Sequence, residues 1–212
     1  MKKNKIVFLT LLTIIAIVIG LWIYSLAKGR VPLLDQWTRS FVDTFGATAF
    51  HSFFTFTTKL GSKVFLIPFV IIAGIVLVYL YKRVLPSTMF ALGTLCSWLL
   101  NHLIKAIVER PRPSLNPALD AVGSSFPSGH AMISFVCYGL LLFFLLGVIK
   151  NRKARITLQI IIPVTILIIG VGRYLINVHY LTDVAAGYFF GYLFLLVWIP
   201  LYNKLSKKSR EI

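Results

Sequence analysis

Long apolar stretches, separated by shorter polar segments, follow one another along most of the chain. At a rise of about 1.5 Å per residue, a helix of about 20 apolar residues crosses the roughly 30 Å hydrocarbon core of a bilayer. Six stretches are long enough to cross or nearly cross it: residues 6–27, 63–81, 85–104, 130–149, 156–171 and 181–202. The pattern predicts an all-α polytopic membrane protein, with residues 1–212 forming a single domain of six transmembrane helices.

The first apolar stretch follows a basic N-terminus, so a secretory signal is an alternative interpretation of it. Ser25-Leu26-Ala27 weakly resembles a cleavage site. The stretch is nevertheless longer than the roughly 7–15 apolar residues of a signal peptide. We therefore interpret residues 1–27 as a retained first span.

Residues 28–61 have a different character, because polar and aromatic residues are mixed in them. Six phenylalanines recur there: Phe41, Phe45, Phe50, Phe53, Phe54 and Phe56. This composition is typical of amphipathic helices at a membrane interface. We expect short helices lying along the outer membrane surface, with His51 an ordinary surface residue, and we expect the segment to influence tail or headgroup preference.

The overall composition is also that of a membrane protein. Hydrophobic residues make up 58% of the chain and charged residues 13%, whereas soluble domains average about 25% charged residues. The net charge of +16 raises the possibility of a nucleic-acid partner. The cations, however, lie mainly in short clusters between apolar stretches, as in loops that flank membrane helices, so we expect no such partner. Cys96 and Cys137 lie within apolar stretches, which argues against a disulfide or metal framework.

The cation clusters also predict how the chain is oriented in the membrane. With both termini in the cytoplasm, the inner segments include the basic tail 203–212 and hold most of the 22 Lys and Arg residues, in line with the positive-inside rule. The polar segments after the third and fifth spans then open on the outer face. We expect a multi-pass protein of the cell membrane whose functional residues face the extracytoplasmic side.

The polar segment 105–128 begins with two cations, Lys105 and Arg112, that are seven residues apart. Pro111 and Pro113 interrupt any helix there, so Arg112 should be presented from a rigid extended segment. Taken alone, a basic loop beside a span is usually solvated charge or a contact with lipid headgroups.

The same segment ends in Phe126-Pro127-Ser128-Gly129-His130, directly before the fourth span. Serine can cap the new helix, and glycine lets another group approach the backbone closely. The helix N-terminus offers unpaired N–H groups and the positive end of a dipole, which suit a phosphate group. His130, in the first turn, could donate a proton to a leaving oxygen. For this peptide alone, an ordinary serine cap followed by an incidental histidine is also reasonable.

A third polar stretch, Gly172–Asp183, lies between two long apolar runs yet contains Arg173, His179 and Asp183. On a helix, residues four apart share one face, with roughly 5–6 Å between their Cβ atoms. Asp183 could then hold one imidazole nitrogen of His179 and leave the other free to react. A helix end at the membrane surface is the simpler interpretation, since Arg, Tyr and His are common there.

Together the three stretches form an ordered motif set: Lys-x6-Arg-Pro, Pro-Ser-Gly-His and Gly-Arg-x5-His-x3-Asp. This set resembles that of the type 2 phosphatidic acid phosphatase family, which includes bacterial undecaprenyl-diphosphate and phosphatidylglycerophosphate phosphatases, glucose-6-phosphatases and vanadium haloperoxidases. One departure is Gly172, where the family often has a serine. A hydroxyl contact is lost at this position, but a backbone N–H can still serve.

The resemblance implies a role for each motif residue. His179 would be the nucleophile that forms a phosphohistidine, and Asp183 would hold its other ring nitrogen. His130 would protonate the leaving oxygen and then activate water. The phosphoryl oxygens would be bound by Lys105, Arg112, Ser128, Gly129 and Arg173. The set has a single carboxylate, so we expect neither a metal nor another cofactor.

These observations predict metal-independent hydrolysis of a membrane lipid phosphate. We favour undecaprenyl diphosphate narrowly, because the outward orientation matches where that carrier is released; phosphatidylglycerophosphate and phosphatidic acid are the alternatives. Six spans argue against a haloperoxidase of the vanadium type, whose members are soluble. A non-catalytic lipid transporter would place charges at the bilayer midplane rather than at the ends of spans. The sequence does not predict an oligomeric state.

Overall fold

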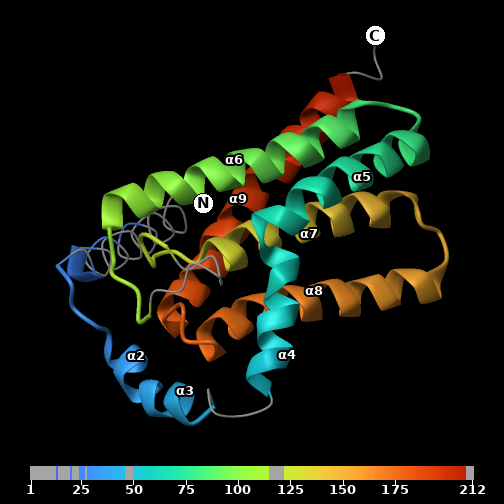
Figure 1. Cartoon of the computed structure of the whole chain (residues 1–212). Coiled ribbons are helices and arrows are strands. Elements are labelled where there is room, and N and C mark those ends of the chain that lie inside the picture. Colours follow the sequence, from blue (N-terminus) through green and yellow to red (C-terminus); the bar gives the residue numbers. More distant parts are fainter. Residues whose placement is uncertain are drawn as a thin grey trace, which may run out of the picture.

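The computed structural model describes residues 13, 20, 24–26, 28–45, 50–114 and 122–208. Within these residues all regular structure is helical (Figure 1). The helices are α2 (Leu33–Trp37), α3 (Arg39–Phe45), α4 (Phe50–Thr57), the 3₁₀-helix η1 (Thr58–Gly61), α5 (Lys63–Tyr81), α6 (Leu85–Val108), α7 (Gly129–Val148), α8 (Arg152–Leu175) and α9 (Leu181–Lys208). Helices α5 to α9 are long and apolar enough to span a membrane. The predicted first span, residues 6–27, lies almost entirely outside the described residues, so the count of six stays a prediction.

The five described spans confirm the predicted apolar stretches, but several helices extend beyond them. The third span was predicted to end at residue 104, whereas α6 continues to Val108, where Glu109 takes a left-handed conformation with φ of 46° and ends it. Lys105 therefore lies in the last turn of a helix rather than in a loop. Helix α8 begins at Arg152, before the predicted fifth span that starts at residue 156, because the side chain of Asn151 caps its first turn. Hydropathy marks where a helix leaves the hydrocarbon, while capping groups mark where it ends.

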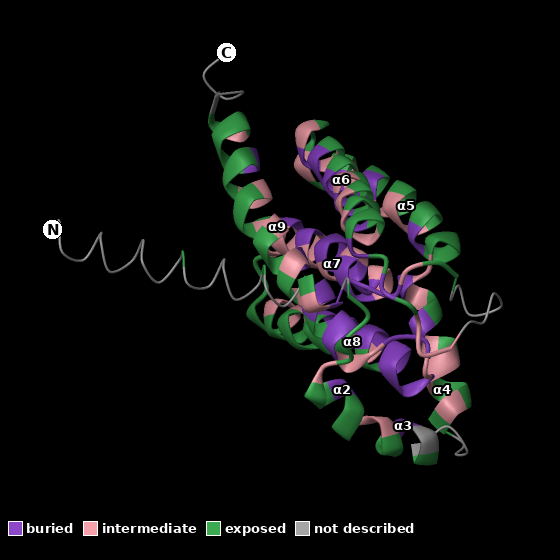
Figure 2. Cartoon of the chain, turned by 90° about the vertical axis from the view of Figure 1, so that its left-hand side faces the viewer, coloured by how far each residue is buried: buried purple, intermediate pink, exposed green. Residues whose placement is uncertain are grey.

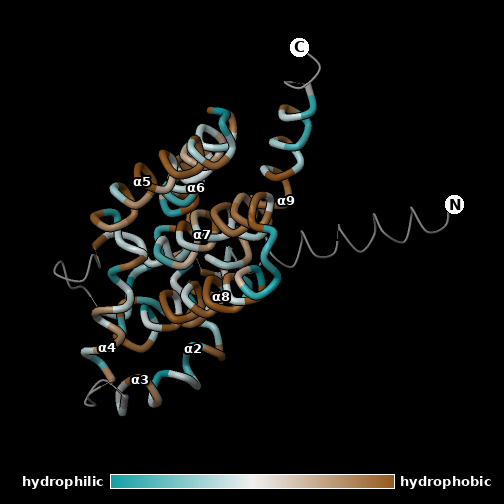
Figure 3. Tube along the Cα trace, turned by 90° about the vertical axis from the view of Figure 1, so that its right-hand side faces the viewer, coloured by the Kyte–Doolittle hydropathy of each residue, from teal (hydrophilic) through white to brown (hydrophobic). Residues whose placement is uncertain are grey.

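Helix α7 is the central element of the fold. It packs against α5, α6, α8 and α9. In its most apolar stretch of 18 residues, 44% of the residues are buried, against 22–28% in the corresponding stretches of the other four spans. Figure 2 shows buried residues concentrated on α7 and on the helix surfaces around it. Hydrophobic residues recur along the long helices (Figure 3). On α5 the exposed side chains include Ile67, Ile71, Ile72, Ile75 and Tyr79, as expected for helices that face lipid.

The long helices alternate in direction, which brings the motif segments together. The N-termini of α5, α7 and α9 and the C-termini of α6 and α8 lie at one end of the bundle (Figure 1). The segments after α6 and after α8, which carry the three motifs, therefore meet at that end. The α5–α6 and α7–α8 connections and the C-terminal end of α9 lie at the opposite end.

The predicted short helices between residues 28 and 61 are present as α2, α3, α4 and η1. They do more than line a surface, because α4 and η1 pack against α8, and α2 packs against α9. Asp35 and Val42 are buried, with exposed fractions of 3% each. The hydroxyl of Tyr174 in α8 also donates to the carbonyl oxygen of Thr38 at 2.7 Å. Segment 28–61 is therefore joined to the spans at the end where the motifs meet.

Candidate active site

A cavity of about 660 Å³ opens at the motif end of the bundle. Its polar end is lined by five residues from all three motifs: Lys105, Arg112, Gly129, His130 and His179. Its apolar wall comes from α5 and α6 and includes Leu66, Ile67, Val70, Leu95 and Trp98. One continuous space thus joins a cluster of cations and histidines to a surface of the kind that holds hydrocarbon.

His179 lies in the turn between α8 and α9, and Asp183 lies in the first turn of α9. The predicted pair is present, with 3.5 Å between His179 Nδ1 and Asp183 Oδ2. The predicted shared helix face is wrong, because α9 begins only at Leu181. Asp183 Oδ2 also accepts from the backbone N–H of Tyr180 at 2.9 Å, as an acid in a capping box does. The same carboxylate therefore starts the helix and holds the histidine.

The second ring nitrogen of His179 faces Arg112, whose Nη1 lies 3.0 Å from Nε2. A guanidinium has no acceptor, so Nε2 must carry a lone pair and the ring proton must be on Nδ1, toward Asp183. The pKa of His179 is lowered to about 3, mainly by burial. The hydrogen bond to Asp183 opposes this shift, and the positive charge of Arg112 adds to it. The imidazole is therefore neutral near pH 7, with its nucleophilic nitrogen directed into the cavity.

Arg112 lies outside the helices, in the segment that follows α6, as the flanking prolines predicted. Three backbone carbonyls hold its guanidinium: those of Val178 at 2.9 Å, Gly123 at 3.1 Å and Val122 at 3.2 Å. Burial lowers the pKa of Arg112, whereas the negative charge of Asp183 raises it. Neutral acceptors therefore hold this cation at the cavity, and none of the three contacts is with a carboxylate.

The other residues at the polar end come from α6 and α7. Lys105 Nζ donates to the carbonyl oxygen of Ser124 at 2.5 Å. His130 is half-buried in the first turn of α7. Gly129 lies against Asn101, and a Cβ at this glycine would come within 3.1 Å of the amide oxygen. Asn101 itself donates to the carbonyl oxygen of Pro127 at 3.4 Å, so it supports the turn that precedes α7.

Three predicted site residues, Ser128, Arg173 and Asp183, are buried behind the cavity and do not line it. Ser128 caps α7 as expected, accepting from the N–H of Ala131 at 3.4 Å. Its own N–H donates to the carbonyl oxygen of Asp183 at 3.0 Å, and the carbonyl of Arg173 accepts from the N–H of His179 at 3.2 Å. In this structure the described contacts of these residues join the start of α7 to the start of α9 and stabilise the turn that carries His179.

Gly172, the departure from the family motif, is explained by packing. A Cβ at this position would lie 2.6 Å from Cγ2 of Thr58 and 3.1 Å from Cδ1 of Phe54. Because α4 and η1 occupy this space, a serine would require them to shift. Segment 28–61 therefore fills the space of the serine side chain at this point.

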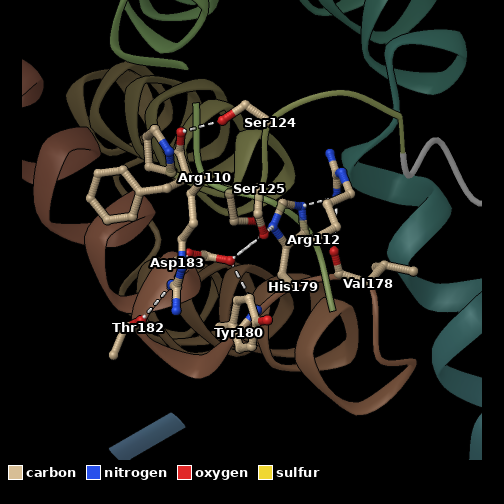
Figure 4. Close-up of polar contacts among 12 residues, drawn as sticks. Arg110, Arg112, Ser124, Ser125, Val178, His179, Tyr180, Thr182 and Asp183 are labelled. Atoms are coloured by element: carbon tan, nitrogen blue, oxygen red, sulfur yellow. Dashed lines mark hydrogen bonds and ion pairs between the residues drawn. The ribbon is translucent and has the colours of Figure 1, made fainter. Parts of the chain in front are cut away.

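Four residues at the site were missed by the sequence reasoning: Asp35, Arg110, Ser125 and Thr182. Ser125 donates its hydroxyl to Asp183 Oδ2, and its oxygen lies 3.4 Å from His179 Nδ1 (Figure 4). Arg110 lies between the carboxylates of Asp35 and Asp183. Arg110 could have been noticed, since it repeats the Arg-Pro pattern two residues before Arg112. Asp35 carried no such signal.

The arrangement has the parts needed for displacement at a phosphate. A neutral imidazole supplies the lone pair, a second histidine in the same cavity can transfer a proton, and two cations can bind anionic oxygens. Among the residues that the structure describes, no three His, Cys, Asp or Glu side chains gather as a metal-binding group.

Comparisons with known proteins agree with this chemistry. The model of the PAP2 superfamily matches residues 86–207. Phosphatidylglycerophosphatase B of Bacillus subtilis is 32% identical over 157 residues, which cover 73% of this chain and 75% of that protein. The crystal structure of a transmembrane PAP2-type phosphatidylglycerolphosphate phosphatase from Bacillus subtilis superposes with a TM-score of 0.72 at 25% identity, covering 89% of this chain and 96% of that one.

Proposed function

This chain belongs to the PAP2 superfamily and is a lipid phosphate phosphatase, and we propose that it hydrolyses phosphatidylglycerophosphate through a phosphohistidine on His179. The observation that carries the proposal is the neutral His179, held by Asp183 on one nitrogen and directed into the cavity on the other. The relatives support the choice of lipid, because both are named for this substrate. They favour it over undecaprenyl diphosphate, the narrow preference from sequence.

In the first step the lone pair of His179 Nε2 attacks phosphorus and the bond to the glycerol oxygen breaks. His130, as the imidazolium, gives its proton to that oxygen, so phosphatidylglycerol leaves as an alcohol. Arg112 turns from Nε2 onto the phosphoryl oxygens, where its fork can bind two of them. Lys105 neutralises further charge, and Asp183 stabilises the positive charge that develops on the imidazole of His179.

In the second step the neutral His130 removes a proton from water, whose oxygen attacks phosphorus. The phosphorus–nitrogen bond breaks, its electron pair returns to His179 Nε2, and inorganic phosphate leaves. His130 is thus the acid in the first step and the base in the second, while His179 is first the nucleophile and then the leaving group. No metal ion takes part in either step of this proposal.

The shape of the cavity supports a lipid substrate. The phosphate would lie at the cationic end, and the glycerol backbone and upper acyl chains would follow the apolar wall of α5 and α6. We place this end of the bundle on the extracytoplasmic side, in keeping with the distribution of cations.

The proposal is tested by phosphate release from the purified protein in detergent with excess chelator. Phosphatidylglycerophosphate, undecaprenyl diphosphate and phosphatidic acid are compared, with His179→Ala as the control. We expect release in the presence of chelator, the highest kcat/KM for phosphatidylglycerophosphate, and no release by the variant. A higher kcat/KM for undecaprenyl diphosphate would overturn the assigned substrate. Phosphate release that survives in His179→Ala would show that His179 is not the nucleophile.

A further inference from the structure

Arg110 is a buried cation that the proposed mechanism leaves unused. It does not line the cavity, and its side chain is 3% exposed. Its Nη1 lies 2.5 Å from Asp183 Oδ1 and 2.9 Å from the hydroxyl of Thr182. The guanidinium also lies over the ring of Tyr180, 3.9 Å from the centroid. Arg110 thus contacts three residues of the segment that directly follows His179 (Figure 4).

Asp35 of α2 holds Arg110 from the other side. Its Oδ2 lies 2.7 Å from Nη2 of Arg110 and 2.5 Å from the hydroxyl of Thr182, and its Oδ1 accepts from the N–H of Thr182 at 3.0 Å. Asp35 contacts neither histidine in any described interaction. Its carboxylate nevertheless fixes the guanidinium and the start of α9 in one arrangement.

The two oxygens of Asp183 have separate partners. Oδ1 faces Arg110, while Oδ2 receives Ser125, the N–H of Tyr180 and the Nδ1 side of His179. The charged contact at Oδ1 therefore sets the rotation of the carboxylate, and this rotation decides where Oδ2 meets the imidazole. The backbone adds a further link, because the N–H of Ser125 donates to the carbonyl oxygen of Arg110 at 2.7 Å.

We propose that Arg110, held by Asp35, is a positioning residue that orients Asp183 and through it the reactive tautomer of His179. The inference rests on the proposed function, since it assigns a task within the same reaction. It also gives segment 28–61 a part in catalysis, because α2 supplies the carboxylate that anchors the cation. An orienting group contributes to the transition state rather than to substrate binding, so its loss should lower kcat and leave KM nearly unchanged.

The test compares Asp35→Asn, Arg110→Gln and Arg110→Lys with the wild type. Glu109→Gln is the matched control, because it removes an exposed charge from the adjacent position. We expect Asp35→Asn and Arg110→Gln to lower kcat on the order of 10- to 100-fold, by analogy with groups that orient a metal-bound histidine, with KM within about 2-fold. Arg110→Lys keeps the positive charge but not the planar guanidinium with its two donor groups, so its kcat should lie between those of Arg110→Gln and the wild type. Glu109→Gln should retain wild-type kcat.

A double variant distinguishes a positioning role of Arg110 from a purely structural one. If Arg110 acts through Asp183, then adding Arg110→Gln to Asp183→Asn should cost little beyond the single Asp183→Asn change. Thermal unfolding in detergent identifies any variant that does not fold, and the conservative Asp35→Asn and Arg110→Lys carry the comparison if Arg110→Gln is lost. Folded Asp35→Asn and Arg110→Lys with wild-type kcat, or fully additive losses with Asp183→Asn, would overturn the inference.

The assay also keeps this inference separate from the substrate assignment. Phosphate release by the wild type that vanishes in His179→Ala tests the proposed function, and only then do the kcat values of the Arg110 and Asp35 variants judge the positioning role. The same variants are measured with p-nitrophenyl phosphate, which carries no lipid chain. A kcat loss with this substrate supports the positioning role even where the lipid assignment fails, and an unchanged kcat counts against it.

Discussion

His130 and His179 line one cavity but have different roles in the proposed reaction, and these roles respond differently to the leaving group. A general acid contributes about 10²- to 10⁴-fold when the leaving oxygen needs a proton. We predict that His130→Gln loses activity in this range with phosphatidylglycerophosphate but far less with p-nitrophenyl phosphate, whose phenolate leaves unprotonated. The measurement is kcat/KM for both substrates with the same preparation. This ratio reports the step in which the leaving group departs, whereas kcat also includes hydrolysis of the phosphohistidine, in which His130 is the base with either substrate.

His179→Gln provides the comparison for that experiment. A missing nucleophile cannot be replaced by a better leaving group, so this variant should be inactive with both substrates. Equal losses for the two substrates in His130→Gln would mean that His130 is not the acid.

The buried imidazole of His179 also predicts a pH dependence of stability. Burial lowers its pKa to about 3 in the folded protein, whereas a histidine in an unfolded chain has a pKa near 6.5. Between these values the unfolded state binds the extra proton, so the stability that the neutral ring provides is present above about pH 6.5 and declines as the pH falls toward 3.

We therefore expect the difference in unfolding midpoint between the wild type and His179→Gln to decrease steadily from pH 7 to pH 4. Thermal unfolding in one detergent at constant ionic strength measures it, and the glutamine variant removes the titration of every other group from the comparison. A difference that is constant over this interval would show that His179 is not buried in its neutral form.

At the scale of elements, the contact of α9 with the start of α7 is the closest to the chemistry. Gly187 of α9 lies so near that a Cβ would come within 2.8 Å of the carbonyl oxygen of Ser128 and 3.1 Å of the N–H nitrogen of Met132. Both are backbone atoms, so Gly187→Ala must move the turn that carries His130. We expect a loss of about 1–3 kcal/mol in the free energy of unfolding and a fall in kcat of roughly 10²-fold.

Gly139→Ala is the matched control on α7. Its new methyl group would meet only the side chain of Leu195, at 2.7 Å from its flexible Cδ1 end, and alanine is the better helix former by about 1 kcal/mol. We expect stability and kcat near those of the wild type. Unfolding midpoints and phosphate release are measured for both variants; equal behaviour of the two would contradict the tight α7–α9 contact.

The five described spans were predictable because lipid-facing helices must be apolar over a length that the bilayer sets. Alternating helix direction then predicted that the three motifs share one end. The sequence could not show that Asp35 reaches Arg110, 75 residues away, because a single buried ion pair leaves no periodic pattern. Nor could it place His179 in a turn, since an aspartate four residues later fits a helix face and a helix N-terminus equally well.

At the scale of the whole molecule, the fold sorts the cations into two groups. The turn at Lys82 and Arg83, the basic segment 150–155 and the C-terminal end of α9 lie at the end opposite the motifs (Figure 1). These are the described clusters that the positive-inside rule assigns to the cytoplasm. The site end would then face outward, where a lipid phosphate in the outer leaflet could reach the cavity between α5 and α6.

Single cysteines at the two ends of α5 test this orientation. Lys59 in η1 and Arg83 after α5 are both exposed, and replacing Cys96 and Cys137 with alanine removes the native thiols. We expect a membrane-impermeant maleimide to label Lys59→Cys on intact cells and Arg83→Cys only after permeabilisation. Each of the two variants, which carries three substitutions, must first release phosphate, which shows that it is folded. Labelling in the reverse pattern would place the cationic pocket in the cytoplasm, so the charge rule would fail here and the substrate would have to come from the inner leaflet.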